Sequence, residues 1–575
     1  MKRLFLTLLL VSGFVQAFSC TSFLVGKKAS KDGSTMITYA ADSHVRYGEL
    51  YFRKGGNWGP NDKVKLYDRG SMKFLGEIPQ APKTYNVIGF MNENQVSIGE
   101  TTFGGRNELE DTTAMMDYGS LMFVAMDRAR TAREAIKVIA ELVEEYGYYS
   151  SGESFSIADP NEVWIMEIIG KGTEMVFDKK SQKMVNKNKG AVWVAIRIPD
   201  DCISAHANHA RITNFKLEDK KTSISSKNLK LIDKPEIEVV YAHDVIEFAK
   251  QKGYFEGKNE DFSFSDSYAP IDFEAARFCE ARVWSFFRRY SSDMDKYLEY
   301  AKGYDLKNRM PLYIKPDKLL GVEDLIDGKR DHYEGTYFDM TKDVGALPHY
   351  LPYRWRPMTW KHNGKNYLHE RATATQQTGF SYVTQMRSKY PNHIGGIIWF
   401  SVDDAASTVY VPFYCGIDKI PHQYAVGNGD MLTYSRDAAF WVFNKVANYA
   451  YLRYDLMSKD IIAKQKELEE KHFKIIKEYD NKALYMFNNN VDKLRVLQNS
   501  LAEELAKETV EAWQELFEYL LVKYIDGNVK REDENGFKRN EHGFPVSPMW
   551  IDYPDKWKDF ILEDTGDKFL VPEEG

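Results

Sequence analysis

The sequence predicts an α+β fold in which two antiparallel sheets are covered by helices, with a helical extension at the C-terminal end. Three observations lead to this prediction. Apolar, β-branched runs separated by turn residues recur along the first 200 residues, an amphipathic helical pattern lies among them, and a long helical stretch follows the last strands. Hairpins first, helices between them and helices at the end fit two antiparallel sheets with helices packed on them.

The first predicted hairpin begins directly after residue 20. Residues 21–26 are apolar and β-branched, Lys31-Asp32-Gly33 is a turn signal, and residues 34–39 form the second strand. As argued below, residue 20 is expected to become the first residue of the mature chain. Chain termini normally fray, so a strand that starts directly at the new terminus indicates that this terminus is held in place.

Two more strands, at 86–90 and 95–99, precede the clearest helix of the sequence. Thr131 followed three residues later by Glu134 is a capping signature, an apolar stripe at helical spacing follows, and Gly147 is a typical C-terminal stop. The sequence therefore predicts a helix between Thr131 and Gly147 with one buried face.

Further strands are predicted at 154–158, 163–168, 193–198, 394–400 and 408–413. Asp403-Asp404 lies between the last two. Paired carboxylates can serve glycoside hydrolysis, but adjacent residues point to different sides of a turn, so we expect a solvated turn there.

Residues 437–524 have a helical pattern, with Ser458 as a candidate cap and a break at 488–490. We therefore divide the chain into a signal peptide (1–19), one large domain (20–450), a helical extension (451–526) and a polar C-terminal tail (527–575).

Composition excludes several classes of protein. The 575 residues carry a formal charge of −7 and contain no Lys/Arg run, which argues against nucleic-acid binding. No stretch after the N-terminal segment has the length and apolar character of a transmembrane helix. The sequence leaves open whether the chain forms a homo-oligomer.

The N-terminal segment predicts export. Lys2-Arg3 form a basic start, residues 4–15 are apolar but too few to span a bilayer, and Ala17-Phe18-Ser19 fits the small-x-small cleavage rule. Cleavage there leaves Cys20 as the first residue of a protein in the periplasm or outside the cell.

The four cysteines, at 20, 202, 279 and 415, form no CxxC pair, so the sequence gives no support for a metal site or a thioredoxin-like site. His206 and His209 are three residues apart, without further ligands at suitable spacing. We expect no metal and no cofactor. A disulfide among the last three cysteines is compatible with export, but its pairing is open.

An N-terminal cysteine combines two groups that a hydrolase needs. Its thiol is a nucleophile, and its free α-amine, with a reference pKa of roughly 7.7–8.0, can accept the thiol proton near neutral pH. The alternative is a surface lipoprotein, acylated at Cys20, that binds peptide or glycan through its aromatic residues. Acylation would abolish the amine base, and Ala17 stands where a lipoprotein signal prefers an aliphatic residue.

Several blocks of sequence together resemble the dipeptidase family of N-terminal-nucleophile cysteine peptidases, peptidase family C69. The resemblance spans roughly residues 20–450 and rests on their order. The blocks are Cys20-Thr21-Ser22-Phe23, Asp42, Met91-Asn92-Glu93, Ala158-Asp159-Pro160-Asn161-Glu162-Val163-Trp164, Trp193-Val194-Ala195-Ile196-Arg197-Ile198-Pro199-Asp200, Ala207-Asn208-His209-Ala210-Arg211-Ile212, Ala281-Arg282-Val283-Trp284, Ile394-Gly395-Gly396-Ile397-Ile398-Trp399-Phe400 and Ser435-Arg436-Asp437-Ala438-Ala439-Phe440-Trp441-Val442-Phe443.

The resemblance implies an αββα sandwich and cleavage of short peptides, typically dipeptides, through a thioester on Cys20. By similarity to the related bile-salt and penicillin V amidases, Asp42 would orient the α-amine, Asn208 would donate to the oxyanion, and Arg282 would lie beside the thiolate. Those amidases carry an Arg three residues before the Asp; here that position is Tyr39. The difference weakens the alternative function, an amidase for bile-salt or N-acyl amides, more than the dipeptidase.

Each of these residues also has a purely structural interpretation. Asp42 at a strand end could be a turn or cap residue, and Asn208 could form an Asx-turn. Arg282 could be a buried ion-pair partner or stack on Trp284.

Overall fold

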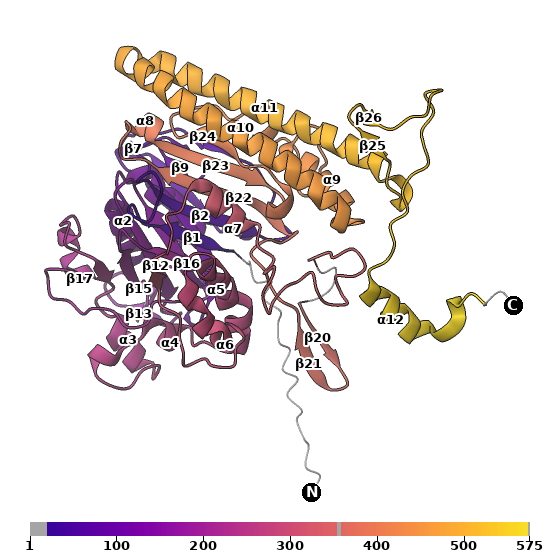
Figure 1. The fold of residues 1–575 in the computed structure, drawn as a ribbon. Coiled ribbons are helices and arrows are strands. Elements are labelled where there is room, and N and C mark those ends of the chain that lie inside the picture. Colours follow the sequence, from indigo (N-terminus) through magenta and orange to yellow (C-terminus); the bar gives the residue numbers. More distant parts are fainter. Residues whose placement is uncertain (1–19, 354–357, 573–575) are drawn as a thin grey trace, which may run out of the picture.

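The computed structural model describes residues 20–353 and 358–572 (Figure 1). The predicted signal peptide, residues 1–19, lies outside the described residues. The structure is a mixed α/β protein with several antiparallel sheets, as the sequence predicts.

The first large sheet has seven strands and begins at the candidate nucleophile. Its order is β19-β16-β1-β2-β22-β23-β24, and every neighbouring pair is antiparallel. β1 starts two residues after Cys20. The strands are β1 (Ser22–Val25), β2 (Thr35–Asp42), β16 (Ile203–His206), β19 (Tyr313–Ile314), β22 (Thr378–Met386), β23 (Gly396–Val402) and β24 (Val411–Tyr414).

The second large sheet has nine strands in the order β17-β18-β15-β12-β11-β10-β9-β8-β3, antiparallel except for the pair β17 and β18. The strands are β3 (Phe52–Arg53), β8 (Val87–Ile88), β9 (Met91–Asn92), β10 (Ser97–Gly104), β11 (Gly152–Ala158), β12 (Val163–Gly170), β15 (Ala191–Ile198), β17 (Ser223–Ser225) and β18 (Val239–Tyr241).

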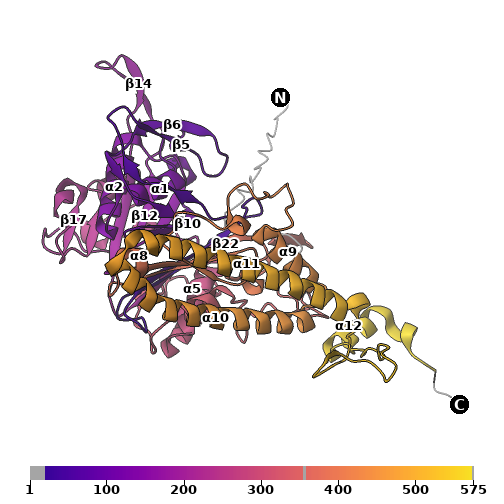
Figure 2. The same cartoon turned by 90° about the horizontal axis from the view of Figure 1, so that it is seen from above.

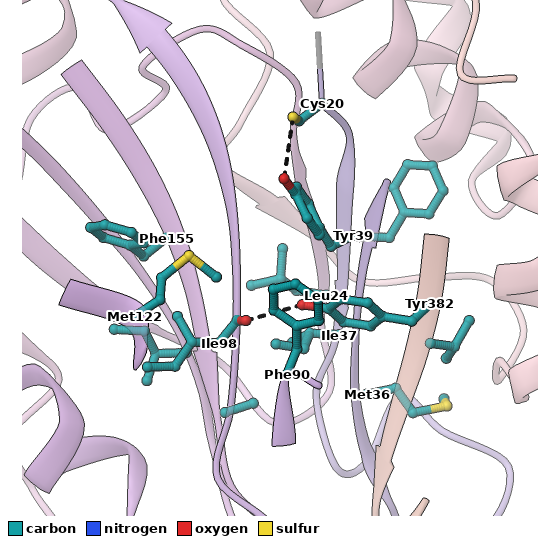
Figure 3. Close-up of a cluster of buried hydrophobic side chains, with 14 of the residues drawn as sticks. Cys20, Leu24, Met36, Ile37, Tyr39, Phe90, Ile98, Met122, Phe155 and Tyr382 are labelled. Atoms are coloured by element: carbon teal, nitrogen blue, oxygen red, sulfur yellow. Dashed lines mark hydrogen bonds between the residues drawn. The ribbon is translucent and has the colours of Figure 1, made fainter. Parts of the chain in front are cut away.

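The two sheets face each other across a buried core. The Tyr382 hydroxyl on β22 donates to the Ile98 carbonyl on β10 at 3.0 Å, and the hydroxyls of Ser97 and Thr384 lie 3.0 Å apart. Side chains between the sheets, shown in Figure 3, are almost fully buried. Polar groups in this interior need partners because an unpaired buried donor or acceptor is destabilising by roughly 1–3 kcal/mol.

Helices pack against both sheets (Figure 1). α1 (Tyr118–Arg128) and α2 (Ala132–Tyr146) contact the nine-stranded sheet. The helices against the seven-stranded sheet are α5 (Ala281–Arg288), α7 (Val322–Lys329), α9 (Ala439–Ala450), α10 (Tyr454–Asn489) and α11 (Val491–Lys523). Shorter helices are α3 (Val245–Gln251), α4 (Phe264–Tyr268), α6 (Leu298–Ala301) and α8 (Asn392–Gly395).

The predicted strands agree with the structure at the first hairpin and differ from it elsewhere: the strand predicted at 394–400 begins only at Gly396, after α8, and that predicted at 408–413 begins only at Val411. β1 and β2 match the predictions at 21–26 and 34–39, although β2 continues three residues further, to Asp42. Of the strand predicted at 86–90, only Val87–Ile88 forms a strand, β8, and a second short strand, β9, follows it at Met91–Asn92. Gly89 has φ +51° between them, in the left-handed region that a turn requires and that suits glycine.

The prediction of a solvated turn at Asp403-Asp404 is wrong, because both residues are buried. Asp404 accepts hydrogen bonds from the hydroxyls of Tyr353, at 2.6 Å, and Tyr451, at 2.8 Å. Asn444 donates to Asp403 at 2.8 Å, and burial raises the pKa of Asp403 to about 8. The partners come from distant segments, so the sequence around the turn gives no sign of them.

The predicted helix at 131–147 is α2. Thr131 caps it by accepting from the Glu134 N–H at 3.1 Å, and Gly147, at φ +76°, ends it. The Glu134 carboxylate bonds the N–H of Arg130 at 2.7 Å, so the capping box is not reciprocal.

The C-terminal helices α10 and α11 run side by side in both views (Figure 1, Figure 2) and both contact β24. α10 ends at Asn489 and the Asn490 side chain caps α11, which confirms the predicted break. Ser458 is not a cap, because α10 begins four residues earlier, at Tyr454.

The remaining elements lie at the margin of the molecule. They are the two-stranded ribbons β4 (Gly56–Asn57) with β7 (Lys83–Thr84), β5 (Lys63–Tyr67) with β6 (Phe74–Pro79), β13 (Met175–Asp178) with β14 (Lys183–Asn186), β20 (Thr359–His362) with β21 (Lys365–Leu368), β25 (Glu532–Asp533) with β26 (Gly536–Phe537), and helix α12 (Asp555–Thr565). None of the helices in the described part of the chain has both the length and the apolar character that crossing a bilayer requires. All four cysteines are unpaired in this structure.

Candidate active site

Cys20 lies at the start of β1, between the two large sheets, and is buried. β1 is flanked by β16 and β2, so residues of both neighbours surround the thiol. Figure 3 shows Tyr39, on β2, with its hydroxyl directed at the Cys20 sulfur. The first predicted hairpin therefore places the candidate nucleophile inside the protein.

The Cys20 nitrogen donates to the side-chain oxygen of Asn208 at 2.8 Å. Arg282 Nη2 donates to the same oxygen at 3.0 Å, and Asn208 Nδ2 donates to the Thr102 carbonyl at 2.7 Å. An arginine can only donate, so Oδ1 of Asn208 must face Arg282 and the Cys20 nitrogen. Asn208 has φ +62°, a conformation that asparagine tolerates better than most residues.

Arg282, on α5, is buried and bonds the backbone around the nucleophile. Nη1 donates to the Cys20 carbonyl at 2.7 Å and to Thr21 Oγ1 at 2.8 Å, and Nε donates to the Phe278 carbonyl at 2.8 Å. The ring of Trp284 lies beneath Arg288 instead, so the stacking interpretation of Arg282 is wrong. Burial, followed by the charge of Arg371, lowers the pKa of the Arg282 guanidinium.

The Cys20 sulfur faces a tyrosine and a glutamate that the sequence did not single out as partners. Sγ lies 3.6 Å from the Tyr39 hydroxyl and 3.9 Å from Glu100 Oε1, and that hydroxyl donates to Glu100. Burial, then the negative charges of Glu100 and Asp42, raise the pKa of the Cys20 thiol well above its ordinary value. The thiol is therefore neutral unless a base takes its proton.

Glu100 is one of two buried glutamates on adjacent strands. Thr102 on β10 is opposite Glu153 on β11, and Glu100 lies two residues before Thr102 on the same face. Thr102 donates to Glu153 at 3.0 Å. Burial raises the pKa of both carboxyls, that of Glu153 the more because of the charge of Glu100. A glutamate within each of two apolar strands was a signal that sequence reasoning passed over.

Asp42, at the end of β2, has its carboxylate held by two residues from far along the chain. Arg371 Nη2 donates to one oxygen at 2.6 Å and Thr378 Oγ1 to the other at 2.7 Å. The charge of Asp42 acts on the Cys20 sulfur, and its backbone N–H favours the thiolate. Asp42 is thus at the site, with its side chain bonded to Arg371 and Thr378 and the Cys20 nitrogen bonded to Asn208.

Lys329, the last residue of α7, also reaches the site. Its ammonium donates to the Thr21 carbonyl and lies over the Phe23 ring, and the side chain is fully buried. Burial lowers the pKa of Lys329 to about 7, against the opposing charges of Asp42 and Cys20. Neither Lys329 nor Arg371 lies in a local pattern that indicates a site.

The two histidines belong to different surroundings. His206 bonds Thr101 at 2.7 Å and Ser156 at 2.6 Å, and so connects β16 to both β10 and β11. Burial lowers the pKa of His206 to about 3 and that of His209 to about 4. In the described ranges no three His, Cys, Asp or Glu side chains come together in a way that could hold a metal ion.

The structure thus places a buried thiol just before a strand, with its backbone nitrogen and carbonyl bound by Asn208 and Arg282. Comparison with known proteins gives the family. The family model of Peptidase family C69 matches residues 19–54 and 66–467, so the chain belongs to that family. It is a peptide-bond hydrolase, and the family is one of cysteine peptidases.

Curated relatives are similar to this chain over most of their length. A protein named Probable dipeptidase from Salmonella dublin is 21% identical over 443 residues, 72% of this chain and 86% of that protein. Probable dipeptidase A from Streptococcus pyogenes serotype M1 is 24% identical over 467 residues, which are 78% of this chain and 85% of that protein. Dipeptidase A from Lactobacillus helveticus is 23% identical over 519 residues, which are 86% of this chain and 94% of that protein.

Proposed function

We propose that this chain is an exported cysteine dipeptidase that becomes active when removal of residues 1–19 turns the Cys20 nitrogen into a free α-amine. The observation that carries the proposal is the bond from that nitrogen to Asn208, in an orientation that Arg282 fixes. The names of the relatives, dipeptidase A among them, support the substrate class. We also propose that the two facing sheets with their helices are the αββα sandwich of the N-terminal-nucleophile hydrolases.

The α-amine is the base in this mechanism. The raised pKa of the thiol keeps it protonated, and the amine has a reference pKa of roughly 7.7–8.0. One amine hydrogen bonds Asn208, which directs the lone pair elsewhere, so the amine can accept the proton from its own thiol.

Hydrolysis then proceeds in two steps that balance. The sulfur adds to the scissile carbonyl carbon, the C–N bond breaks, and the second amino acid leaves as an amine that takes the proton. The first amino acid remains as a thioester on Cys20. Water adds to the thioester with the α-amine as base, the C–S bond breaks, and the proton returns to the thiol.

The proposed roles of the site residues follow from their contacts. Asn208 holds the α-amine, Arg282 fixes Asn208 and the Cys20 carbonyl, and Asp42 supplies negative charge that favours the ammonium formed in the reaction. Because Asn208 Nδ2 donates to Thr102, its contacts support binding of the amine better than donation to the oxyanion. The Asp42 backbone N–H, which favours the thiolate of Cys20, is the candidate oxyanion donor instead.

The test begins with the mass of the exported protein. Processing that leaves an unmodified Cys20 as residue one supports the proposal, whereas a diacylglycerol and an amide-linked acyl chain on Cys20 would remove the base and favour the lipoprotein. The processed protein is then assayed on dipeptides and on glycocholate. Hydrolysis of dipeptides but not glycocholate separates the peptidase from the amidase.

Variants of Cys20 complete the test. Cys20→Ala should abolish dipeptide hydrolysis, and Cys20→Ser should lose most of it, because the serine hydroxyl is far less acidic than a thiol. Both should keep the melting temperature close to that of the wild type. Near-wild-type turnover by Cys20→Ala would end the proposal.

A further inference from the structure

A small pocket lies beside the nucleophile, and its lining is unusual for the interior of a protein. Two of its residues, Tyr39 and Glu100, are the neighbours of the Cys20 sulfur, at 3.6 Å and 3.9 Å. Two arginines, Arg46 and Arg69, line it as well. A group bound in this pocket is therefore one side chain away from the attacking sulfur.

Arg69 lines the pocket, and its guanidinium has no ion-pair partner in the described part of the chain, although Asp117 accepts from its backbone N–H at 2.8 Å. Among the described residues, no carboxylate oxygen lies within ion-pair distance of its guanidinium. The guanidinium lies over the Phe123 ring, 4.8 Å from the ring centre, and 5.8 Å from that of Tyr51. Arg69 is partly buried, and a guanidinium that lies over aromatic rings without an anionic partner is available to an anion from outside.

The pocket wall is shaped around this side chain. A Cβ atom added at Gly119, on α1, would lie 2.9 Å from Cβ and Cδ of Arg69. Real Cβ atoms do not approach carbon so closely, and Gly119 therefore leaves the space through which Arg69 passes. Arg46 reaches the same pocket and donates to the Tyr118 hydroxyl at 3.1 Å.

The charges in the lining favour one additional anion. Arg46 and Arg69 bring two positive charges, and Glu100 brings one carboxylate, which the Tyr39 hydroxyl already bonds. Burial raises the pKa of Glu100 and of Glu153 behind it, so a proton held by this pair weakens their repulsion of a bound anion. The tyrosine hydroxyl of Tyr118 adds a neutral donor.

We infer that Arg69, together with Arg46, binds a carboxylate of the substrate, namely the C-terminal α-carboxylate of a dipeptide whose scissile carbonyl faces Cys20. This inference rests on the proposed function, since it assigns a subsite of the same active site. A dipeptide has its α-carboxylate one residue beyond the scissile bond, which matches a pocket one side chain from the sulfur. The subsite gives a physical reason for preferring dipeptides to longer chains, whose carboxylate lies farther from the scissile bond.

The experiment compares alanyl-alanine with its C-terminal amide in the processed protein. We expect amidation to lower kcat/KM by about 10- to 100-fold in the wild type, the usual effect of losing a hydrogen bond to a charged group. In Arg69→Met the acid should fall to the level of the amide, and the preference should shrink to less than about threefold. Equal hydrolysis of acid and amide by the wild type would overturn the inference.

Two further variants guard against an effect of misfolding. Gly119→Ala retains the charge but displaces Arg69, and it should reduce the preference for the acid as Arg69→Met does. Arg53→Met is the matched control: Arg53 also lies over the Phe123 ring, at 4.4 Å, but pairs with Asp127 and does not line the pocket. It should keep the full preference. A folded Arg69→Met protein that keeps the full preference would contradict the inference.

The carboxylate could also come from an acidic side chain, and alanyl-glutamate beside alanyl-glutamine separates the two sources. Suppose that Arg69→Met loses a preference for alanyl-glutamate over alanyl-glutamine but still prefers alanyl-alanine to its C-terminal amide. That result would overturn the assignment to the α-carboxylate. Calorimetric binding of alanyl-alanine and its amide to Cys20→Ala tests the subsite without catalysis. Selective binding of the acid by Cys20→Ala, together with a processed wild-type protein that hydrolyses no peptide, would retain the subsite and reject the peptidase mechanism.

Discussion

Arg282 Nη2 donates to Asn208 Oδ1 at 3.0 Å, and this bond determines which end of the asparagine amide faces the nitrogen of Cys20. The two residues are 74 positions apart in the chain. With Oδ1 fixed by a group that can only donate, the Cys20 nitrogen must be the donor in its bond to Asn208. The relationship gives a role to Arg282, a buried arginine of α5 that has no carboxylate partner among the described residues and bonds the chain just before β1.

The first prediction concerns the Asn208 side chain. Asn208→Gly removes the amide but adopts the φ of +62° without steric strain, whereas Asn208→Ala removes the same amide and adds strain of about 1–2 kcal/mol. If Asn208 holds the amine, both variants should lose about 10²–10³-fold in kcat, as is typical of a lost catalytic hydrogen bond. Steady-state kinetics and thermal unfolding of both proteins check this.

The purely structural interpretation of Asn208 predicts a different result. An Asx-turn residue would lower the melting temperature in both variants and leave kcat unchanged in the protein that remains folded. A lower melting temperature in Asn208→Ala alone, with the same loss of kcat in both variants, would confirm the separation of strain from function.

Local rules predicted those parts of the fold that depend on neighbouring residues. The ends of α2 follow from Thr131 and Gly147, because a cap and a left-handed stop act within one helical turn. The first hairpin follows from the two apolar, β-branched runs on either side of Lys31-Asp32-Gly33. The same rules misplaced the start of α10, since Ser458 resembles a cap whether or not a helix has already begun.

The site could be predicted only where a motif carries it. Cys20 was found from its place after the predicted cleavage site, and Asn208 and Arg282 through blocks of similar sequence. The structure brings the three residues into direct contact. Arg371 could not be found in this way, since it lies 329 residues from Asp42 and its approach depends on the pairing of β2 with β22. Glu100 needed the register of β10, which no local pattern supplies.

The second prediction concerns the effect of Glu100 on the thiol. Glu100→Gln removes a negative charge 3.9 Å from Sγ and keeps a group that can accept from Tyr39. The pKa of the Cys20 thiol should fall by about one unit or more, because a nearby like charge disfavours the thiolate. The pH dependence of Cys20 alkylation by iodoacetamide, followed by mass spectrometry of its peptide, measures this.

Glu141→Gln, at an exposed position of α2, is the control for Glu100→Gln and should leave the alkylation profile unchanged. An unchanged profile in Glu100→Gln as well would show that burial alone sets the pKa of the thiol.

The third prediction concerns the buried Lys329. Its pKa of about 7 lies below the ordinary value of 10.5, so between these two pH values the unfolded chain binds more protons than the folded chain. Burying the protonated Lys329 therefore destabilises the folded protein. This destabilisation is complete below pH 7 and is relieved as the pH rises toward 10.5. Lys329→Met removes this destabilisation, and its gain in unfolding free energy should be about 2–3 kcal/mol larger at pH 6 than at pH 9.

Urea unfolding of Lys329→Met at the two pH values tests this difference, with Lys137→Met, at a partly exposed position of α2, as the control. The bond to the Thr21 carbonyl comes from an ammonium at pH 6 and from a neutral amine at pH 9, so its change with pH is part of the titration of Lys329 that the comparison measures. The same gain at pH 6 and pH 9 would mean that Lys329 keeps an ordinary pKa in the folded protein. We also expect Lys329→Met to lower kcat, because that carbonyl adjoins the nucleophile.

The fourth prediction concerns stability in acid. His206 bonds Thr101 and Ser156 and so ties the two large sheets together, and burial lowers its pKa to about 3 from an ordinary value of 6.5. Between these values the unfolded chain binds the extra proton, so stability falls as the pH drops from about 6.5 toward 3, by about 1.4 kcal/mol per pH unit. His206→Gln retains polar contacts without a titrating group, and its stability should decline less steeply over this range.

Urea unfolding between pH 7 and pH 4 measures how steeply the stability of the wild type and of His206→Gln changes with pH. His542→Gln, at an exposed position, is expected to follow the wild type. Identical slopes for the wild type and His206→Gln would show that other groups, such as His209 with its pKa of about 4, account for the loss of stability in acid.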